Sequence, residues 1–125
     1  MNPWGKKGSG NSGGSGKDGT KLEREHYEDI RKFMVGREWM VRKVTVMHGS
    51  MAGWPDVFAA HKLYGTRFIE TKRPIKSKMT DDQRRVFADF QEHGVGIWVI
   101  ETVHDYPLLF KPANWWMYAV PGFRP

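Results

Sequence analysis

The sequence contains no cysteine, which excludes disulfide frameworks, thiolate nucleophiles and zinc sites built from cysteine. Its five histidines show no H-x-x-x-H or comparable ligand spacing, so a zinc hydrolase is not expected either. No stretch approaches the run of about 18 apolar residues that a membrane span requires, and the N-terminus lacks the apolar segment of a signal peptide. We therefore expect a cytoplasmic protein without a membrane partner.

Acidic residues are fewer than basic residues. The 125 residues include 20 Lys and Arg against 14 Asp and Glu, which gives a formal net charge of +6 at pH 7. Such an excess favours a polyanionic partner such as nucleic acid or an acidic membrane surface, although a merely soluble basic protein fits the charge equally well. The hydrophobic share of 39%, with six Trp, seven Phe and four Tyr, is enough for one core.

The first twenty residues have few apolar side chains. Residues 1–20 form a Gly/Ser-rich run with scattered lysines, which cannot bury apolar area. We expect this run to be a flexible, solubilising tail, and residues 21–125 to form a single domain.

Hydrophobic periodicity predicts one helix and three strands in the first part of this domain. Apolar residues recur with the spacing of one helical face over residues 21–35, which predicts a helix. Three later segments are rich in β-branched and aromatic residues, which is typical of strands. Only a short turn separates the second and third of these segments, so they should pair as a hairpin. The strand segments are residues 39–47, 55–61 and 66–71.

The second part of the domain opens with a helix-capping pattern. Thr80-Asp-Asp-Gln83 is a capping box with Thr80 as the N-cap, and Gly94 is expected to close the helix. Residues 95–103 are almost continuously apolar, which predicts a strand covered on both faces, and residues 106–110 are expected to add an edge strand. A strand, helix, strand passage usually makes a right-handed parallel crossover. The expected fold class is therefore α/β, in the order α-β-β-β-α-β, with a mixed sheet flanked by helices.

Two acidic residues and a lysine stand at the ends of neighbouring strand segments. Asp56 follows a proline at the start of one segment, and Glu70, Thr71 and Lys72 end the next. Residues two apart in a strand share a face, so Glu70 and Lys72 should point the same way. If the two strands pair, Asp56 and Glu70 come together, and two such carboxylates repel each other unless a cation bridges them.

Carboxylate oxygens in this arrangement suit Mg²⁺ or Mn²⁺, which take one or two carboxylates together with waters and phosphate oxygens. Such an ion would polarise a scissile phosphate and lower the pKa of a bound water. Lys72 would position or deprotonate that water and balance charge in the transition state. The pattern therefore predicts metal-assisted phosphodiester hydrolysis, although each piece alone also occurs as an ordinary turn dipeptide or a surface ion pair.

Three segments follow one another in a specific order: Gly53-Trp54-Pro55-Asp56, Phe68-Ile69-Glu70-Thr71-Lys72 and Met79-Thr80-Asp81-Asp82-Gln83, with the Gly94 turn and the apolar strand after them. In these segments the chain resembles the PD-(D/E)XK nuclease superfamily. More narrowly, it is similar to the virus-type replication-repair nuclease (VRR-NUC) branch, which includes small phage and bacterial proteins. The resemblance covers about residues 21 to 103. It implies a restriction-endonuclease-like core that cuts DNA with Mg²⁺ or Mn²⁺.

The resemblance also implies roles for four residues. In the family, the counterparts of Asp56 and Glu70 bind the divalent metal. The backbone carbonyl at the position of Thr71 can add a ligand, and the counterpart of Lys72 assists hydrolysis. Small stand-alone members can resolve four-way DNA junctions as dimers, which suggests a structure-specific endonuclease resembling a Holliday junction resolvase, and a homodimer. If a phage encodes the chain, its location would be the host cytoplasm.

Two further catalytic candidates each have a structural alternative. The family uses an acidic residue from the first helix, and Glu23 is our choice for catalysis and metal binding. On a helical wheel Glu23 falls within the apolar stripe, whereas Glu25 lies nearly opposite. An acid at a favourable helix N-terminus is the alternative. Gln83 matches a glutamine that family members place near the active site, but position N3 of a capping box also favours Gln or Glu.

A cationic segment follows the candidate site. It would place positive charge where phosphate contacts are needed, although lysines on a solvated loop are the alternative. The expected nucleic-acid-binding residues are Arg73, Lys76, Lys78, Arg84 and Arg85.

Two other functions remain open from the sequence. The first is a non-catalytic basic protein that binds nucleic acid. The second is an RNA-binding module that stacks bases on Trp115 or Trp116, and it ranks last because the aromatic-rich strand signature of such modules is missing. For these two tryptophans we favour packing over an apolar sheet face or core edge.

Overall fold

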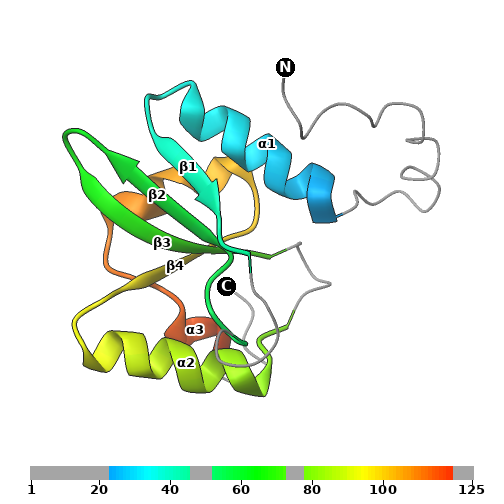
Figure 1. Cartoon of the computed structure of the whole chain (residues 1–125), viewed down its shortest axis with the longest axis vertical. Coiled ribbons are helices and arrows are strands. Elements are labelled where there is room, and N and C mark those ends of the chain that lie inside the picture. The colour runs from blue at the N-terminus through cyan, green and yellow to red at the C-terminus, as the bar shows by residue number, and fades with distance from the viewer. Residues whose placement is uncertain (1–22, 46–51, 73–77, 120–125) are drawn as a thin grey trace.

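The chain folds into a four-stranded sheet and several helices (Figure 1). The structure, a computed structural model, describes residues 23–45, 52–72 and 78–119, with the side chain of Glu23 excepted. In chain order the elements are α1 (Glu23–Val35), β1 (Met40–Lys43), β2 (Val57–His61), β3 (Gly65–Thr71), α2 (Asp81–Glu92), β4 (Ile97–Ile100), the 3-10 helix η2 (Val103–Phe110) and α3 (Trp116–Ala119).

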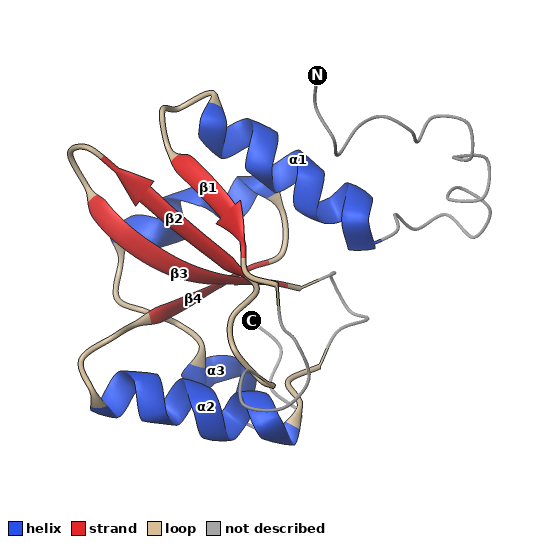
Figure 2. Ribbon diagram, in the orientation of Figure 1, coloured by secondary structure: helices blue, strands red, loops and turns tan. Residues whose placement is uncertain are grey.

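The four strands form one mixed sheet in the order β1-β2-β3-β4. β2 pairs antiparallel with both β1 and β3, and β3 pairs parallel with β4 across the α2 crossover. The predicted hairpin and parallel crossover are therefore confirmed. Helices cover both faces of the sheet, with α1 and η2 on one side and α2 and α3 on the other (Figure 2). No helix in the described ranges is long and apolar enough to cross a membrane.

Alternation along β3 divides the core into two halves. Ile69 is buried with Ile30 of α1, whereas Phe68 packs with Phe87 of α2 on the other face. Successive side chains of a strand point to opposite faces. Glu70, two residues after Phe68, therefore lies on the α2 face, at the end of the strand.

Gly53 brings the turn before β2 against the start of α2. Its φ is +87°, and a Cβ at this position would lie 2.6 Å from the backbone oxygen of Asp82. Only glycine combines this left-handed conformation with so close an approach. The next residue, Trp54, packs edge-on against Phe90 with ring centroids 5.0 Å apart. The segment that leads into Asp56 is thereby held against α2.

The chain after β4 differs from the expectation. Residues 106–110, expected as an edge strand, belong to the 3-10 helix η2, and β4 ends at Ile100 instead of continuing to residue 103. The hydroxyl of Thr102 accepts a hydrogen bond from the backbone of His104, and the carboxylate of Asp105 accepts one from the backbone of Thr102. The edge-strand prediction was wrong because it overlooked this Thr102-x-x-Asp105 capping box, which opens a helix.

The far edge of β4 is closed by a side chain. The amide of Asn114 accepts a hydrogen bond from the backbone N–H of Val99 at 2.7 Å and donates one to its carbonyl at 3.2 Å. It thus takes the place of one residue of a neighbouring strand, which protects an edge that could otherwise pair with another chain. The next residue, Trp115, is buried against Phe87, which confirms the packing role expected for it, whereas Trp116 is 53% exposed.

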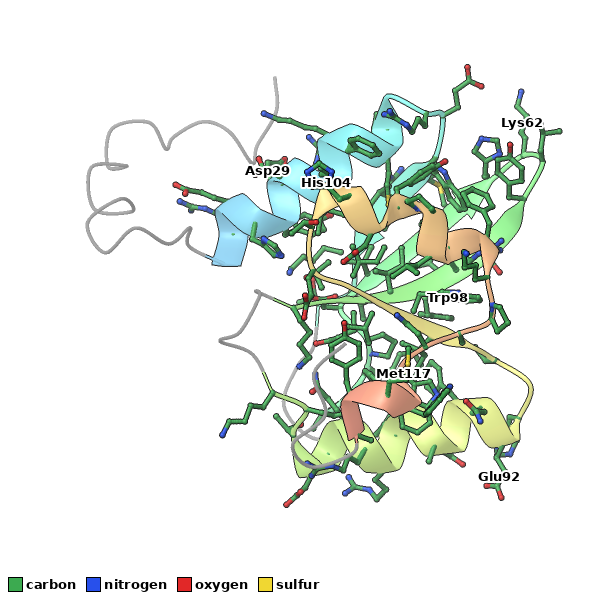
Figure 3. All side chains as sticks on the ribbon, turned by 180° about the vertical axis from the view of Figure 1, so that it is seen from behind. Asp29, Lys62, Glu92, Trp98, His104 and Met117 are labelled. Atoms are coloured by element: carbon green, nitrogen blue, oxygen red, sulfur yellow. The ribbon has the colours of Figure 1, made fainter. Side chains whose placement is uncertain are left out.

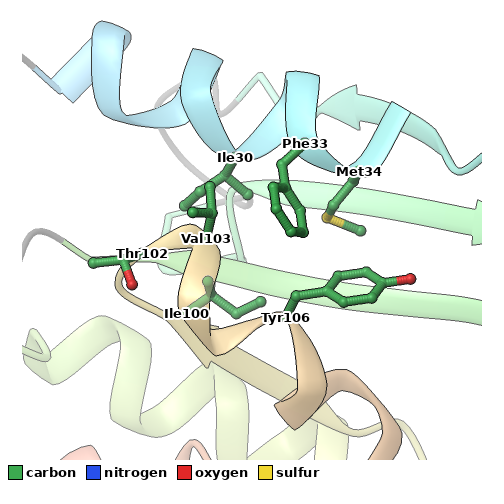
Figure 4. A pocket seen from close by; sticks show the side chains of 7 residues that line it. All are labelled: Ile30, Phe33, Met34, Ile100, Thr102, Val103 and Tyr106. Carbon is green, nitrogen blue, oxygen red and sulfur yellow. The ribbon is translucent and has the colours of Figure 1, made fainter. Parts of the chain in front are cut away.

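A small apolar cavity lies between α1, β4 and η2 (Figure 4). Its lining includes Ile30, Met34 and Ile100, and its volume is about 10 Å³. A volume of this size holds about one water molecule at most, and a water needs several polar partners. The cavity is therefore a packing defect and not a ligand site.

We expect Gly53→Ala to lower the free energy of unfolding more than Gly65→Ala does. Both residues have positive φ, +87° and +85°, so each variant carries the strain of an L residue in the left-handed region, about 1–2 kcal/mol. A Cβ at Gly65 would meet nothing within 4 Å, whereas at Gly53 it would meet the backbone of Asp82. Urea denaturation of both variants measures the difference, and equal losses would contradict the close approach.

Candidate active site

Asp56 stands immediately before β2, between the ends of two other strands. Val57 pairs with Ile69, so continuing this register by one residue places Asp56 opposite Glu70. On the other side, the carbonyl of Asp56 accepts a hydrogen bond from the backbone N–H of Val44 at 2.8 Å. The backbone of Asp56 is thus held beside both β1 and β3.

The carboxylate of Asp56 is oriented by Thr71. Its Oδ1 accepts from the backbone N–H of Thr71 at 3.0 Å, and its Oδ2 accepts from the hydroxyl of Thr71 at 2.7 Å. Burial raises the pKa of Asp56, while these two hydrogen bonds and the charges of Lys43 and Lys72 oppose the rise. A carboxylate has about four lone-pair sites, so each oxygen can still accept a further ligand.

Glu70 is buried and only partly satisfied. Its Oε2 accepts a hydrogen bond from Nε2 of Gln83 at 2.8 Å, and Oε1 has no hydrogen-bond partner in the described part of the chain. Burial, followed by the negative charge of Asp56, raises the pKa of Glu70 to about 7, although Lys72 and Gln83 act in the opposite direction. A buried carboxylate oxygen without a partner is unfavourable, so the surroundings of Glu70 stabilise its charged form only in part.

The side chain of Lys72 is surrounded by acceptors. Its Nζ donates to the carbonyl of Lys78 at 3.0 Å and to Oε1 of Gln83 at 2.9 Å, and it lies 3.4 Å from Oε2 of Glu70. A lysine ammonium has three N–H donors, and three acceptors enclose this one. The amine is therefore an oriented positive charge next to Glu70.

Gln83 joins the helix cap to the charged pair. Its backbone N–H donates to the hydroxyl of Thr80, and its Oε1 accepts from the backbone N–H of Thr80. The same oxygen accepts from Lys72, while the amide nitrogen donates to Glu70. The two roles considered for Gln83 in the sequence are thus compatible, because one amide takes part in both.

His26 was missed in the sequence, although its position carried a signal. It lies four residues before Ile30 and eight before Met34, on the buried stripe of α1. Its side chain is 8% exposed, and Nε2 donates to the backbone carbonyl of Lys72 at 3.2 Å. The backbone N–H of Lys72 donates to Ile100 at 3.0 Å. His26 therefore links α1 to the strand end that carries Lys72.

Some predicted site residues lie outside the described part of the chain. Glu23 is the first residue of α1, but its side chain is not described, and Arg73 and Lys76 fall in a segment that is not described. Their roles stay predictions.

The remaining predicted cations lie at the surface near α2. Arg84 pairs with Asp81 at 2.6 Å and Arg85 with Asp82 at 3.1 Å, while Lys78 is exposed. Exposed ion pairs of this kind contribute about 0–1 kcal/mol. Both guanidinium groups can therefore exchange these partners for a phosphate.

The described donors fit a hard dication only in part. No group of three or more His, Cys, Asp or Glu side chains that could hold a metal ion occurs within residues 23–45, 52–72 and 78–119. The two carboxylates of Asp56 and Glu70 are nonetheless oxygen donors of the kind that Mg²⁺ takes, with waters and substrate oxygens completing its shell. A cation bound here would give Oε1 of Glu70 a partner and would lower the raised pKa of that residue. The two carboxylates therefore fit a dication whose other ligands would come from outside this pair.

A mixed sheet with helices on both faces places the chain in the restriction-endonuclease-like class of α/β folds. Within this class the chain is similar to a solved structure described as "VRR_NUC domain", with a TM-score of 0.53 and 22% identity. The similarity covers 66% of this chain and 91% of that chain, and at this identity it establishes the fold. No protein-family model and no curated protein matches the sequence.

We expect the stability of the protein to fall as the pH rises from about 5 to 7, and Glu70→Gln to reduce this dependence. The pKa of Glu70 is about 7 in the folded protein against an ordinary value of 4.5. Between these values the folded state binds a proton that the unfolded chain has lost, so raising the pH favours unfolding, by roughly 3 kcal/mol over the full range. Urea denaturation across this range measures it, and an unchanged slope in Glu70→Gln would contradict the assignment.

Gln83→Glu should separate the two roles of Gln83. A glutamate at this position still completes a capping box, but it cannot donate to Glu70 and adds a negative charge beside it. We expect near-normal thermal stability at pH 5, where Glu70 is protonated, and a clear loss at pH 8, where two neighbouring carboxylates are charged. Thr80→Ala is the control, because it removes the cap and should lower stability by about 1 kcal/mol at both pH values. Similar behaviour of the two variants would argue that capping is the whole role of Gln83.

Proposed function

We propose that the chain is a metal-dependent nuclease that hydrolyses DNA phosphodiester bonds. The observation that carries the proposal is the meeting of Asp56, Glu70 and Lys72 at one end of the sheet. The charge of Asp56 raises the pKa of Glu70, and Glu70 lies 3.4 Å from the amine of Lys72. The fold, which is similar to that of a structure described as "VRR_NUC domain", supports the same class of activity.

The proposed cofactor is Mg²⁺ or Mn²⁺. Asp56 and Glu70 would hold it through their carboxylates, and the carbonyl of Thr71 and the carboxylate of Glu23 are further candidate ligands. When bound, such a dication lowers the pKa of a water molecule and polarises the phosphate. The contribution of the chain is to orient the ligands: Thr71 directs both oxygens of Asp56, and Gln83 fixes one oxygen of Glu70.

Lys72 would act through its charge. All its N–H donors face acceptors, so its role is to offset negative charge that develops on the phosphate and not to accept a proton. Lys72 and Glu70 each have a side chain that is 7% exposed. Exclusion of water at this depth strengthens electrostatic interactions.

DNA is the proposed substrate because cations lie beside the helix end that carries part of the site. Lys78, Arg84 and Arg85 lie near the first turn of α2, which carries Gln83. Arg73 and Lys76 are further candidate phosphate contacts from the sequence. The narrowest form of the proposal is a structure-specific endonuclease that resolves branched DNA as a homodimer.

Lys72→Met should separate catalysis from binding. We expect the wild-type protein to cut labelled DNA with Mg²⁺ or Mn²⁺ and not with EDTA, on a panel of duplex, flap and four-way junction substrates. The variant should cut at least about 100-fold more slowly, because one oriented charge in the transition state is lost. Its affinity for the same DNA, measured in EDTA, should be largely retained.

Lys32→Met is the matched control, since Lys32 is an exposed lysine of α1 and should leave the cleavage rate unchanged. Cleavage that persists in EDTA, or in Lys72→Met, would overturn the proposed site. Binding of DNA without cleavage under any metal would instead identify a non-catalytic nucleic-acid-binding protein.

A further inference from the structure

Exposed apolar side chains gather at the opposite end of the sheet from Glu70 and Lys72. Leu63 is 80% exposed, Tyr64 46% and Phe110 44%. The first two belong to the turn between β2 and β3, and Phe110 ends η2. Figure 3 shows the tip of this hairpin at Lys62, remote from α2. We call Leu63, Tyr64 and Phe110 the hairpin surface.

The hairpin surface rests on packed rings. The ring of Tyr64 lies 4.4 Å from that of His61 and 4.8 Å from that of Phe110, and it stacks on Trp39 at 6.1 Å. Trp39 is 3% exposed, and its indole N–H donates to the hydroxyl of Tyr106 at 3.0 Å. A ring held in this way loses little conformational freedom when a ligand stacks on it.

Hydrogen bonds tie the three segments of this end together. Nδ1 of His61 accepts from the backbone N–H of Leu63 at 3.0 Å, so Nε2 carries the proton that is donated to the carbonyl of Arg37 at 3.1 Å. The guanidinium of Arg67 donates to the carbonyl of Leu109 at 2.8 Å. The hairpin, the turn after α1 and the end of η2 therefore form one rigid platform.

The charge around the platform is positive. In residues 36–39, 61–67 and 108–111 there are four cations, and Glu38 is the one acidic residue. Lys62, Lys111 and Arg37 are exposed. A second copy of the chain docked symmetrically on this surface would bring like charges together, which is unfavourable. Exposed rings bordered by cations are instead the combination that binds unpaired bases and their phosphates.

We propose that the hairpin surface binds single-stranded DNA, with the rings of Tyr64 and Phe110 stacking on unpaired bases and Lys62 and Lys111 contacting the backbone. The inference rests on the proposed function for its choice of DNA. β3 runs from Gly65, beside this surface, to Thr71, beside Asp56, a distance of about 20 Å for a strand of this length. A strand with stacked bases spans it in about six nucleotides. The substrate would then carry an unpaired segment about this far from the bond that is cut.

Tyr64→Ala tests the proposal through binding of a labelled oligothymidylate, measured by fluorescence anisotropy in EDTA so that no cleavage occurs. We expect a loss of affinity of about tenfold, because a base loses its stacking partner. Tyr64→Phe keeps the ring and should keep the affinity. Trp116→Ala is the matched control, since Trp116 is a comparably exposed aromatic residue, 53%, on α3.

A variant with both Lys62→Glu and Lys111→Glu tests the charge without touching the rings, and it should also bind more weakly, even if Tyr64→Ala does not fold. Full affinity in Tyr64→Ala or the charge-reversal variant, or an equal loss in Trp116→Ala, would overturn the proposal. So would tighter binding of the matching RNA, or self-association of the protein that Tyr64→Ala abolishes in sedimentation velocity.

Failure of the proposed function can be told apart from failure of this inference. Lys72→Met should bind the oligothymidylate normally while losing cleavage. Tyr64→Ala should cut plain duplex normally and cut a duplex with a single-stranded arm more slowly. If the wild-type protein cuts no DNA but binds the oligothymidylate through Tyr64, the proposed nuclease activity is refuted and the proposed binding surface is supported.

Discussion

The side-chain amide of Gln83 connects the first turn of α2 to the end of β3. Its oxygen accepts from Thr80 and Lys72, and its nitrogen donates to Glu70. Two oppositely charged side chains, both buried, are thereby set 3.4 Å apart by a group whose own position depends on the helix cap. A buried ion pair is stable only when its remaining donors and acceptors are satisfied. The cap of α2 and the positions of Glu70 and Lys72 therefore depend on each other.

The negative charges of Asp56 and Glu70 are nevertheless only partly compensated by their neighbours. Glu70 is buried and Asp56 half-buried, each has a raised pKa, and one oxygen of Glu70 has no partner in the described part of the chain. A protein selected for stability alone would have little reason to keep two carboxylates together here, whereas such perturbation is common where a charged ligand binds. The same reasoning makes His26 informative, since it is a buried polar side chain of α1 directed at the backbone of Lys72. Residues of α1, α2 and β4 thus all contact Lys72.

The sheet separates two kinds of surface. At one end, the strand termini and α2 enclose the charged side chains of Glu70 and Lys72. At the other end, the β2–β3 turn and η2 expose aromatic rings that are bordered by cations. β3 is the rigid connection between them, because it pairs along its length with β2 and β4. If both surfaces contact one nucleic acid, the length of β3 sets the distance between those contacts.

The sequence alone determined what depends on local spacing. The shared face of Glu70 and Lys72 follows from strand alternation, and the helix start at Thr80 follows from its capping box. The hairpin follows from a short turn between two strands, and the parallel crossover from the order strand, helix, strand. Residues 106–110 show the limit of such reading, since their apolar composition outweighed a capping box that was also present. Only the tertiary structure decided which distant groups meet: His26 with the carbonyl of Lys72, Thr71 with the carboxylate of Asp56, and Tyr64 with Phe110. The pKa of Glu70, about 7, belongs to the same category. Burial and long-range contact depend on how whole faces pack, and no local pattern encodes that.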